Sequence, residues 1–405
     1  MPIIQRKREL SKLSVLKGRN LIKVITGVRR CGKSTLLLQF QDLLKAENPL
    51  APVVSINMDL PEFRFLAEKN WKEIYDYIQN LLQKNVMNYV FIDEIQNVPE
   101  FEKLLEGLFV NPDVDLYVTG SNAYLLSSDL ATLLTGRAFE INILPFSFAE
   151  YLEYTGKSAN PDRAFAEFMR TGGFPEAIGL AQESENFAYE YLNTVFQNIY
   201  ENDIQKRHTI YYDTSYREVV HFLIDNLGSA ISAGNIAKSL TANGKKIDNK
   251  TVSKYVNTLV ESYLFYKVNR YDIKGKQHLA TQEKYYLVDL GLRYALLGKE
   301  FSADAGHLLE NVIFFELQRR DEQVWIGKTD NLEVDFVARG KDGYTKYIQV
   351  ALTVKDQKTL ERELAPFAKI PDYNKRLLIT TDYETGSRNG VKQVNAIDWL
   401  LNNKT

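Results

Sequence analysis

The sequence predicts an α/β protein built around a parallel sheet, and three features of the chain support this fold class. Between residues 20 and 148, short β-branched or aromatic runs alternate with longer segments of helical spacing. That alternation is typical of parallel strands whose crossover helices cover both faces of a sheet. A glycine-containing turn at 27–35 directly follows the first run. The chain has 405 residues, beyond the roughly 250–300 at which a single core stops growing, so we expect several domains.

The N-terminal domain, predicted to span residues 1–147, contains five expected strands. They lie at 24–26, 53–56, 89–92, 116–119 and 141–144, where Pro145 ends the last one. From 148 to 217 the aromatic and apolar residues recur at helical spacing, which predicts a helical lid. Gly172, Gly173 and Pro175 interrupt this lid, because paired glycines and a proline do not suit a helix interior.

Residues 218–298 predict a winged helix-turn-helix. Three apolar stripes indicate three helices, and we expect Asn249 to cap the third. Runs at 264–268 and 285–288, around a turn at Gly275, predict the wing hairpin. Residues 299–405 predict a further α/β domain, with helices at 308–317 and 360–367 and strands at 324–326, 333–338, 347–350 and 377–380.

Residues 27–35 have the composition of a phosphate-binding loop. Such a loop needs glycines where backbone N–H groups turn toward an anion, a lysine for the terminal phosphates and a hydroxyl for Mg²⁺. The strand at 24–26 precedes the loop and the helix at 35–44 follows it, so the helix N-terminus would point at phosphate. We therefore expect ATP and Mg²⁺ as ligands. The residues expected to bind them are Gly27, Val28, Arg29, Arg30, Cys31, Gly32, Lys33, Ser34 and Thr35.

Two acids stand at the end of the strand at 89–92. Asp93 would hold Mg²⁺ through water, and Glu94 would polarise the attacking water. The alternative is an acidic pair that only caps the next helix. The following strand ends in Thr-Gly-Ser-Asn at 119–122, where a polar side chain, with Ser121 and Asn122 as the candidates, would sense the γ-phosphate or orient the water.

Two further residues have two interpretations each. Arg137 precedes the last strand, where it would reach the phosphoryl group of a neighbouring subunit or serve as a surface ion-pair partner. Cys31, the single cysteine, either fills a permissive loop position or acts as a redox-sensitive brake on nucleotide binding.

As a set, these motifs resemble the AAA+ superfamily, and more narrowly a group of prokaryotic AAA+ ATPases with a C-terminal domain of the restriction-nuclease-like type. The resemblance covers nearly the whole chain. Its motifs are the phosphate loop, Phe-Ile-Asp-Glu-Ile-Gln at 91–96, Thr-Gly-Ser-Asn at 119–122, Leu-Thr-Gly-Arg at 134–137, Leu-Pro-Phe-Ser-Phe at 144–148 and Gly-Gly-Phe-Pro-Glu at 172–176.

The resemblance implies a role for each candidate residue of the ATPase site. Lys33 and Ser34 would bind phosphate and Mg²⁺, Asp93 would hold the metal, and Glu94 would be the base. Ser121 or Asn122 would be the sensor, and Arg137 gains support as an arginine finger. In the lid, Arg170 beside the Gly-Gly turn is the candidate for a second sensor, although it matches that motif poorly.

The C-terminal segment resembles a nuclease fold that places an acid on each of two strands and a lysine two residues after the second. Here Glu310 lies on a helix, Asp335 on a strand and Gln349 on the next strand, and the resemblance implies that the carboxylates bind Mg²⁺. Gln349 replaces the second acid and Ala351 the lysine, while Lys355 would have to fold back across the strand end. We expect a degenerate domain that does not cut, and the acids are alternatively ordinary satisfied polar residues.

A net charge of -2 argues against a uniformly basic coat for nucleic acid, but the predicted winged helix is locally basic. From residue 232 to 285, ten basic residues face four acidic ones, a difference of +6, which suits contact with DNA phosphates. Winged helices also dock proteins, so both partners stay open. The ten are Lys238, Lys245, Lys246, Lys250, Lys254, Lys267, Arg270, Lys274, Lys276 and Lys284.

These features together predict an AAA+ ATPase that couples ATP binding and hydrolysis to DNA engagement by its C-terminal modules. The alternatives are a nucleotide-controlled switch that binds a protein partner and an ATP-dependent DNA nuclease. A homo-oligomer is compatible with every motif. One cysteine, no signal-peptide pattern and no apolar run of about 18–20 residues indicate a cytoplasmic protein without a membrane segment.

Overall fold

The computed structural model describes residues 2–67, 69–123, 136–206, 210, 214–298 and 305–402. The chain divides into two units, which we describe separately. The first contains residues 2–143 with 261–263, and the second contains residues 144–260 with 264 onward. Within the described ranges, no helix combines the length and the apolar character needed to cross a membrane.

The first unit is built on a five-stranded sheet in the order β2-β3-β4-β1-β5. Every neighbouring pair is parallel, which confirms the predicted α/β class with a parallel sheet. The strands are β1 (Ile22–Thr26), β2 (Val53–Asn57), β3 (Asn88–Asp93), β4 (Val114–Gly120) and β5 (Ala138–Asn142). All five residues of β1 are buried, as a central strand covered on both faces requires.

The fifth strand was predicted at 141–144, and these bounds are wrong, because the strand lies earlier in the chain. β5 begins at Ala138 and is the edge strand beside β1. Phe139 and Glu140 are exposed there, so the first half of the strand lacks the buried apolar pattern of the other strands. An exposed edge carries a weaker sequence signal than a buried strand.

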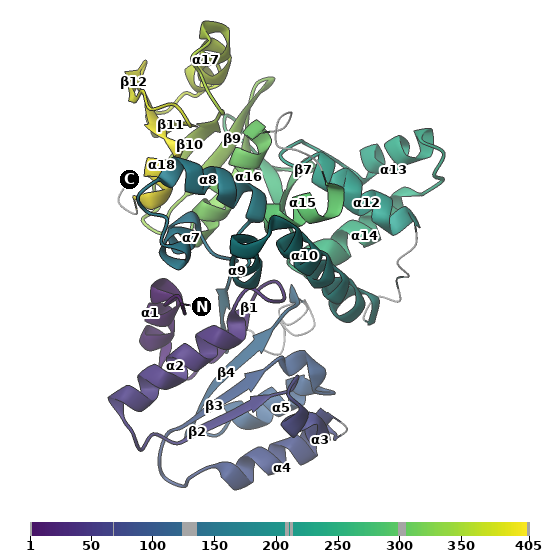
Figure 1. Ribbon diagram of the computed structural model, residues 1–405, viewed down its shortest axis with the longest axis vertical. Helices are drawn as coiled ribbons and strands as arrows, with labels where there is room; N and C mark the ends of the chain where they lie inside the picture. Colours follow the sequence, from purple (N-terminus) through teal and green to yellow (C-terminus); the bar gives the residue numbers. More distant parts are fainter. Residues whose placement is uncertain are drawn as a thin grey trace. The chain divides into compact units, whose positions relative to one another are not determined.

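Helices cover both faces of this sheet (Figure 1). On one face, apolar side chains of the strands form a single core with those of α4 and α5. On the other face, Phe40 of α2 packs on Phe91 and Tyr117, and α1 packs on α2. The helices are α1 (Lys7–Leu16), α2 (Lys33–Glu47), α3 (Arg64–Ala67), α4 (Trp71–Leu81) and α5 (Phe101–Phe109), with short 3₁₀ turns η1 (Pro61–Phe63) and η2 (Ile95–Asn97).

The second unit begins with the helices expected at 148–217. They are α7 (Phe148–Thr155), α8 (Pro161–Thr171), α9 (Pro175–Glu183) and α10 (Glu185–Ile199), followed by a π-helical segment η4 (Tyr200–Gln205). The Gly-Gly turn separates α8 from α9, and a Cβ on Gly173 would lie 2.3 Å from the carbonyl oxygen of Phe146. The buried Asp289 carboxylate accepts the N–H groups of Gly173 and Gly291, and burial raises its pKa to about 6.

Three helices and a hairpin follow: α12 (Thr214–Asp225), α13 (Ala233–Ala242), α14 (Asn249–Glu261), β6 (Phe265–Asp272) and β7 (Gln277–Leu287). The prediction that Asn249 caps the third helix is wrong. Asp248 caps it instead, because its Oδ1 accepts the N–H groups of Lys250 at 2.8 Å and Thr251 at 2.9 Å. α15 (Leu290–Leu297) follows the hairpin.

The hairpin belongs to an eight-stranded sheet in the order β12-β13-β11-β10-β9-β8-β6-β7. β6 pairs in parallel with β8, so one sheet continues across the boundary predicted at 298/299. The other strands are β8 (Gln323–Thr329), β9 (Leu332–Arg339), β10 (Thr345–Val350), β11 (Lys375–Thr380), β12 (Gly386–Arg388) and β13 (Val391–Asn395). The helices are α16 (Ala305–Arg319), α17 (Gln357–Leu364) and α18 (Ala396–Leu401), with a 3₁₀ turn η5 (Phe367–Lys369). α16 packs across β7, β8, β9 and β10 (Figure 1).

Candidate active site

The phosphate loop connects the carboxyl end of β1 to the N-terminus of α2. Arg30 and Gly32 have left-handed backbones, with φ of 69° and 105°, which turn successive peptide groups of the loop. A Cβ on Gly27 would lie 2.1 Å from the carbonyl oxygen of Ile143, so only glycine fits there. α2 starts at Lys33, and its first N–H groups therefore face the loop. All nine residues expected at 27–35 lie on this loop or the first turn of α2.

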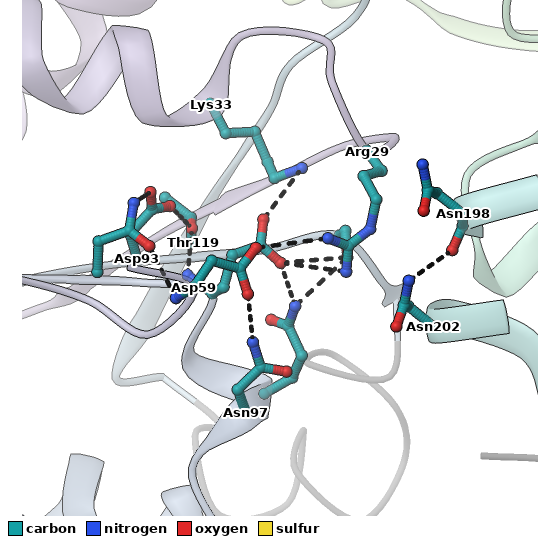
Figure 2. A network of polar contacts seen from close by, with 12 residues as sticks. Arg29, Lys33, Asp59, Asp93, Asn97, Thr119, Asn198 and Asn202 are labelled. Atoms are coloured by element: carbon teal, nitrogen blue, oxygen red, sulfur yellow. Dashed lines mark hydrogen bonds and ion pairs between the residues drawn. The ribbon is translucent and has the colours of Figure 1, made fainter. Parts of the chain in front are cut away.

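Lys33 crosses the loop toward the end of β3. Its Nζ donates to the carbonyl oxygens of Gly27 at 3.0 Å and Val28 at 3.1 Å, and it lies 3.9 Å from Glu94 Oε1. Figure 2 shows Lys33 and Arg29 both reaching into this polar network. The lysine side chain is only 3% exposed, so its charge acts in a poorly screened environment.

Asp93 is held at the carboxyl end of β3 by neutral donors. Asn57 Nδ2 donates to its Oδ2 at 2.8 Å, and the Thr119 hydroxyl donates to its Oδ1 (Figure 2). Burial raises the pKa of Asp93, while hydrogen bonds from Ser34 and Thr119 oppose the rise. A carboxylate bonded to the Ser34 hydroxyl is a donor set that suits Mg²⁺. Thr119, which the sequence indicated only as part of the 119–122 motif, is the residue that joins the two acids, because its Oγ1 also accepts the Glu94 N–H at 2.9 Å.

Glu94 turns its carboxylate toward the loop. It has a left-handed φ of 55°, and its Oε2 lies 3.8 Å from Arg29 and 3.4 Å from Ser121 Oγ. Burial raises its pKa, but the charges of Lys33 and Arg29 outweigh burial and lower it, so the carboxylate is ionised at neutral pH. The alternative that Glu94 only caps the next helix is not supported, since its carboxylate is directed at these partners.

The two candidate sensors differ in what surrounds them. Ser121 contacts Glu94 directly and also accepts from Gln96 Nε2 at 3.3 Å. Asn122 is fully buried at the next position of the chain. Both lie at the carboxyl end of β4, beside β3 and β1 in the sheet, as the strand order requires.

Arg137 is not brought to this site within one chain. It precedes β5, where its carbonyl accepts the Ile22 N–H at the start of β1, whereas Asn142 pairs with Thr26 beside the loop. At about 3.3 Å per residue, the length of β5 separates it from the loop by about 16 Å. Its guanidinium lies 5.7 Å from the ring centre of Phe109. Leu134 and Thr135 of the same motif lie outside the described residues, and Arg170 in the second unit pairs with Glu185 at 3.2 Å.

The N-terminal segment supplies a residue that the sequence did not reveal. Arg6 donates to the carbonyl oxygen of Cys31 at 3.0 Å and is 5% exposed. Gln39 of α2 holds this segment through the Ile4 carbonyl at 2.7 Å and the Arg6 N–H at 3.3 Å. Cys31 itself is buried, and burial raises its pKa, which disfavours the reactive thiolate that a redox-sensitive brake needs.

Residues 19–152 match a family model described as an AAA domain, and residues 162–303 match one described as a domain of unknown function (DUF8612). An uncharacterized protein of Haemophilus influenzae is 36% identical over 404 residues, which are 98% of this chain and 99% of that protein. The chain belongs to the family of this relative and contains an AAA domain. This match supports the resemblance to AAA+ P-loop proteins for residues 19–152.

Another member of this family is an uncharacterized protein of Methanocaldococcus jannaschii. It is 30% identical over 366 residues, which are 86% of this chain and 78% of that protein. Among solved structures, AMPPCP-bound DnaA from Aquifex aeolicus is 13% identical to this chain. The match covers 64% of this chain and 90% of the DnaA chain, with a TM-score of 0.34.

Beyond the AAA domain, the structure brings Glu310, Asp335 and Gln349 together on α16, β9 and β10. Gln349 Oε1 accepts the Asp335 N–H at 2.7 Å, and its Nε2 donates to Glu363 at 3.0 Å. Ala351 is buried just after β10, and Lys355 is exposed. The sequence missed Lys284 here, because it lies on β7 and was counted as a surface charge.

Proposed function

We propose that this protein binds Mg²⁺ and ATP in its AAA domain, hydrolyses the ATP, and couples its nucleotide state to DNA engagement by residues 214–287. One observation carries the ATPase proposal. Lys33, the Ser34–Asp93 pair and the ionised Glu94 converge at the carboxyl end of one parallel sheet, against a loop whose backbone suits an anion.

Each of these groups has a role in the proposed reaction. Ser34 and Asp93 would hold Mg²⁺, which when bound neutralises phosphate charge. Lys33, now bonded to carbonyls of its own loop, would exchange them for oxygens of the terminal phosphates. Glu94 would accept a proton as water attacks the γ-phosphorus and the bond to the β–γ bridging oxygen breaks, releasing ADP and phosphate. Ser121 and Asn122 would orient the γ-phosphate.

The DNA part of the proposal rests on the exposed face of α14. Val252, Val256 and Leu259 point inward, while Lys250 and Lys254 are exposed one helical turn apart. We propose that α12, α13 and α14 with the β6–β7 hairpin form a winged helix whose third helix meets DNA phosphates.

The structure reduces the basic surface that the sequence predicted. Lys284 is buried, so counting it among the phosphate-contacting residues was wrong. Lys267 and Lys274 are engaged with Glu283 and Asp330. The positive charge available to DNA phosphates is therefore smaller than the ten basic residues of the sequence suggest. Besides Lys267 and Lys274, the exposed or half-buried lysines of this segment are Lys238, Lys245, Lys246, Lys250, Lys254 and Lys276.

The proposal is tested by steady-state ATP hydrolysis with single-stranded, duplex and branched DNA at low and moderate salt. Hydrolysis should disappear in Lys33→Ala. One DNA form should stimulate turnover, and stimulation should weaken as salt rises. Lys250→Ala/Lys254→Ala should keep basal hydrolysis and lose stimulation, with the salt slope of duplex binding reduced by about 0.9 for each lost phosphate contact.

The matched control is Lys341→Ala/Lys358→Ala, which removes two exposed lysines elsewhere in the chain. It should behave like the parent. Hydrolysis that is indifferent to every DNA would contradict the DNA proposal and favour a switch that binds a protein partner. Absence of hydrolysis and of nucleotide binding in the parent would contradict the ATPase proposal itself.

A further inference from the structure

Lys284 places a buried ammonium group among three carboxylates of the C-terminal sheet. Its Nζ lies 2.9 Å from Glu310 Oε1, 2.8 Å from Glu333 Oε1 and 4.0 Å from Asp335 Oδ1. The lysine side chain is 3% exposed and the Glu310 side chain 5%. The acids come from α16 and β9, and the lysine from β7 of the hairpin. The group therefore joins three elements around one positive charge.

Further protein groups contact Glu310 and Asp335 in this cluster. The Tyr286 hydroxyl donates to Glu310 Oε1 at 2.6 Å, and His307 Nδ1 lies 3.6 Å from Glu310 Oε2. Asp335 Oδ2 accepts the Val350 N–H at 2.8 Å. These donors fix the Glu310 and Asp335 carboxylates around the ammonium and leave these two acids few oxygen lone pairs for another ligand.

These residues do not fit the divalent metal that the nuclease resemblance implies. Such a metal needs free carboxylate oxygens, and a metal beside Glu310 and Asp335 would lie close to the Lys284 ammonium, which repels it. Gln349 adds no negative charge at the position of the second acid. Across the part of the chain that the structure describes, no group of three or more His, Cys, Asp or Glu side chains is arranged to hold a metal ion.

We infer that the Lys284 ammonium is the resident cation of this cluster, where it takes the place of a divalent metal and closes the site to metal-dependent cleavage. Ala351 cannot supply the positive charge that a nuclease lysine would bring, and Lys284 of the β6–β7 hairpin supplies a positive charge in its place. The Lys284 ammonium pairs with the acids and does not face a substrate. The C-terminal sheet is therefore a domain that does not cleave by a metal-dependent route. This inference does not depend on ATP hydrolysis.

Thermal unfolding with and without Mn²⁺ tests the inference on the full-length chain. All proteins carry Asp93→Asn and are free of nucleotide, so that the ATPase site does not respond to the ion. The parent should show no Mn²⁺-dependent shift. Lys284→Met leaves the buried acids without their counter-ion, so its midpoint should fall in EDTA and rise by about 3 °C or more with saturating Mn²⁺.

Two further proteins complete the comparison. Lys284→Met/Glu310→Gln removes one charge of each sign and should recover stability without responding to Mn²⁺. Lys267→Met, an exposed lysine on the neighbouring strand β6, should match the parent. If Lys284→Met does not fold, folding of the double variant supports the inference, and failure of both variants to fold contradicts it.

Three other results would overturn the inference. One is a Mn²⁺-dependent shift of the parent that Glu310→Gln removes, because the acids would then bind metal with Lys284 in place. Another is a folded Lys284→Met protein whose midpoint ignores Mn²⁺. The third is Mg²⁺-dependent nicking of plasmid DNA by the wild-type protein that Asp335→Ala abolishes.

Discussion

Replacing Glu94 by glutamine should separate ATP binding from ATP turnover. Glutamine keeps the size of the side chain and can still bond Ser121, which lies 3.4 Å from Glu94 Oε2. It loses the proton-accepting carboxylate and the negative charge that faces Lys33 and Arg29 at 3.9 and 3.8 Å. The substitution therefore removes the proton acceptor and the negative charge with little change in the shape of the side chain.

The expected magnitudes follow from these contacts. A positioned general base contributes about 10²–10⁴-fold to a rate, so kcat should fall by that factor, or about 3–5 kcal/mol in activation free energy. A charge pair near 4 Å interacts by about 4 kcal/mol before competing hydration, at an effective dielectric of about 20. Because Glu94→Gln releases Lys33 from that attraction, affinity for ATP should hold or rise.

Equilibrium titration with Mg²⁺ and ATP and phosphate release at saturating ATP measure the two quantities. Glu100→Gln is the matched control, since Glu100 has a 55% exposed side chain that pairs with Lys103. It should change neither quantity. The reasoning is refuted if Glu94→Gln loses affinity as completely as Lys33→Ala, or if it retains the parent kcat.

Three more predictions concern other residues. Arg6→Ala should raise KM for ATP by roughly tenfold or more with a smaller change in kcat, because a charged hydrogen bond contributes about 1.5–3 kcal/mol; Arg6→Lys should restore part of the loss, and an unchanged KM would refute support of the loop by Arg6. Arg137→Ala should leave equilibrium ATP affinity unchanged, since Arg137 lies at the far end of β5, and a loss of affinity in titration would contradict that placement. For Asp289, whose folded pKa of about 6 exceeds its unfolded value, the native state binds more protons between about pH 4 and pH 6. Wild-type stability relative to Asp289→Asn should therefore fall as pH rises through that window, by about 3 kcal/mol in denaturant titrations, and a constant difference would refute it.

The first sheet was largely predictable because its signals are local. β1, β3 and β4 are almost wholly buried, β2 is a β-branched run with its second and fourth residues buried, and each of the four lies within a few residues of its expected position. β5 was misplaced because half of it is exposed at an edge. β13 and α18 were not predicted. β13 has only two apolar residues, Val391 and Val394, and α18 has six residues, too few for a helical period to be recognised.

The candidate ATPase site was also predictable where its residues are close together in the sequence. Gly27, Lys33 and Ser34 lie in one turn, and Asp93 and Glu94 end one strand, so consecutive residues specify their geometry. Thr119 was harder to single out, because its bonds to both acids depend on how β3 lies beside β4.

The sequence alone determined that this protein has a parallel α/β core with a phosphate loop and an acidic strand end, because backbone turns and strand ends are set by neighbouring residues. Only the tertiary structure decided that Arg6 supports the loop, that the hairpin enters the C-terminal sheet, and that Lys284 lies among Glu310, Glu333 and Asp335. These contacts join residues 25 to 56 positions apart. No local spacing encodes such contacts, since they arise when separate segments pack together and a buried charge must find its counter-charge.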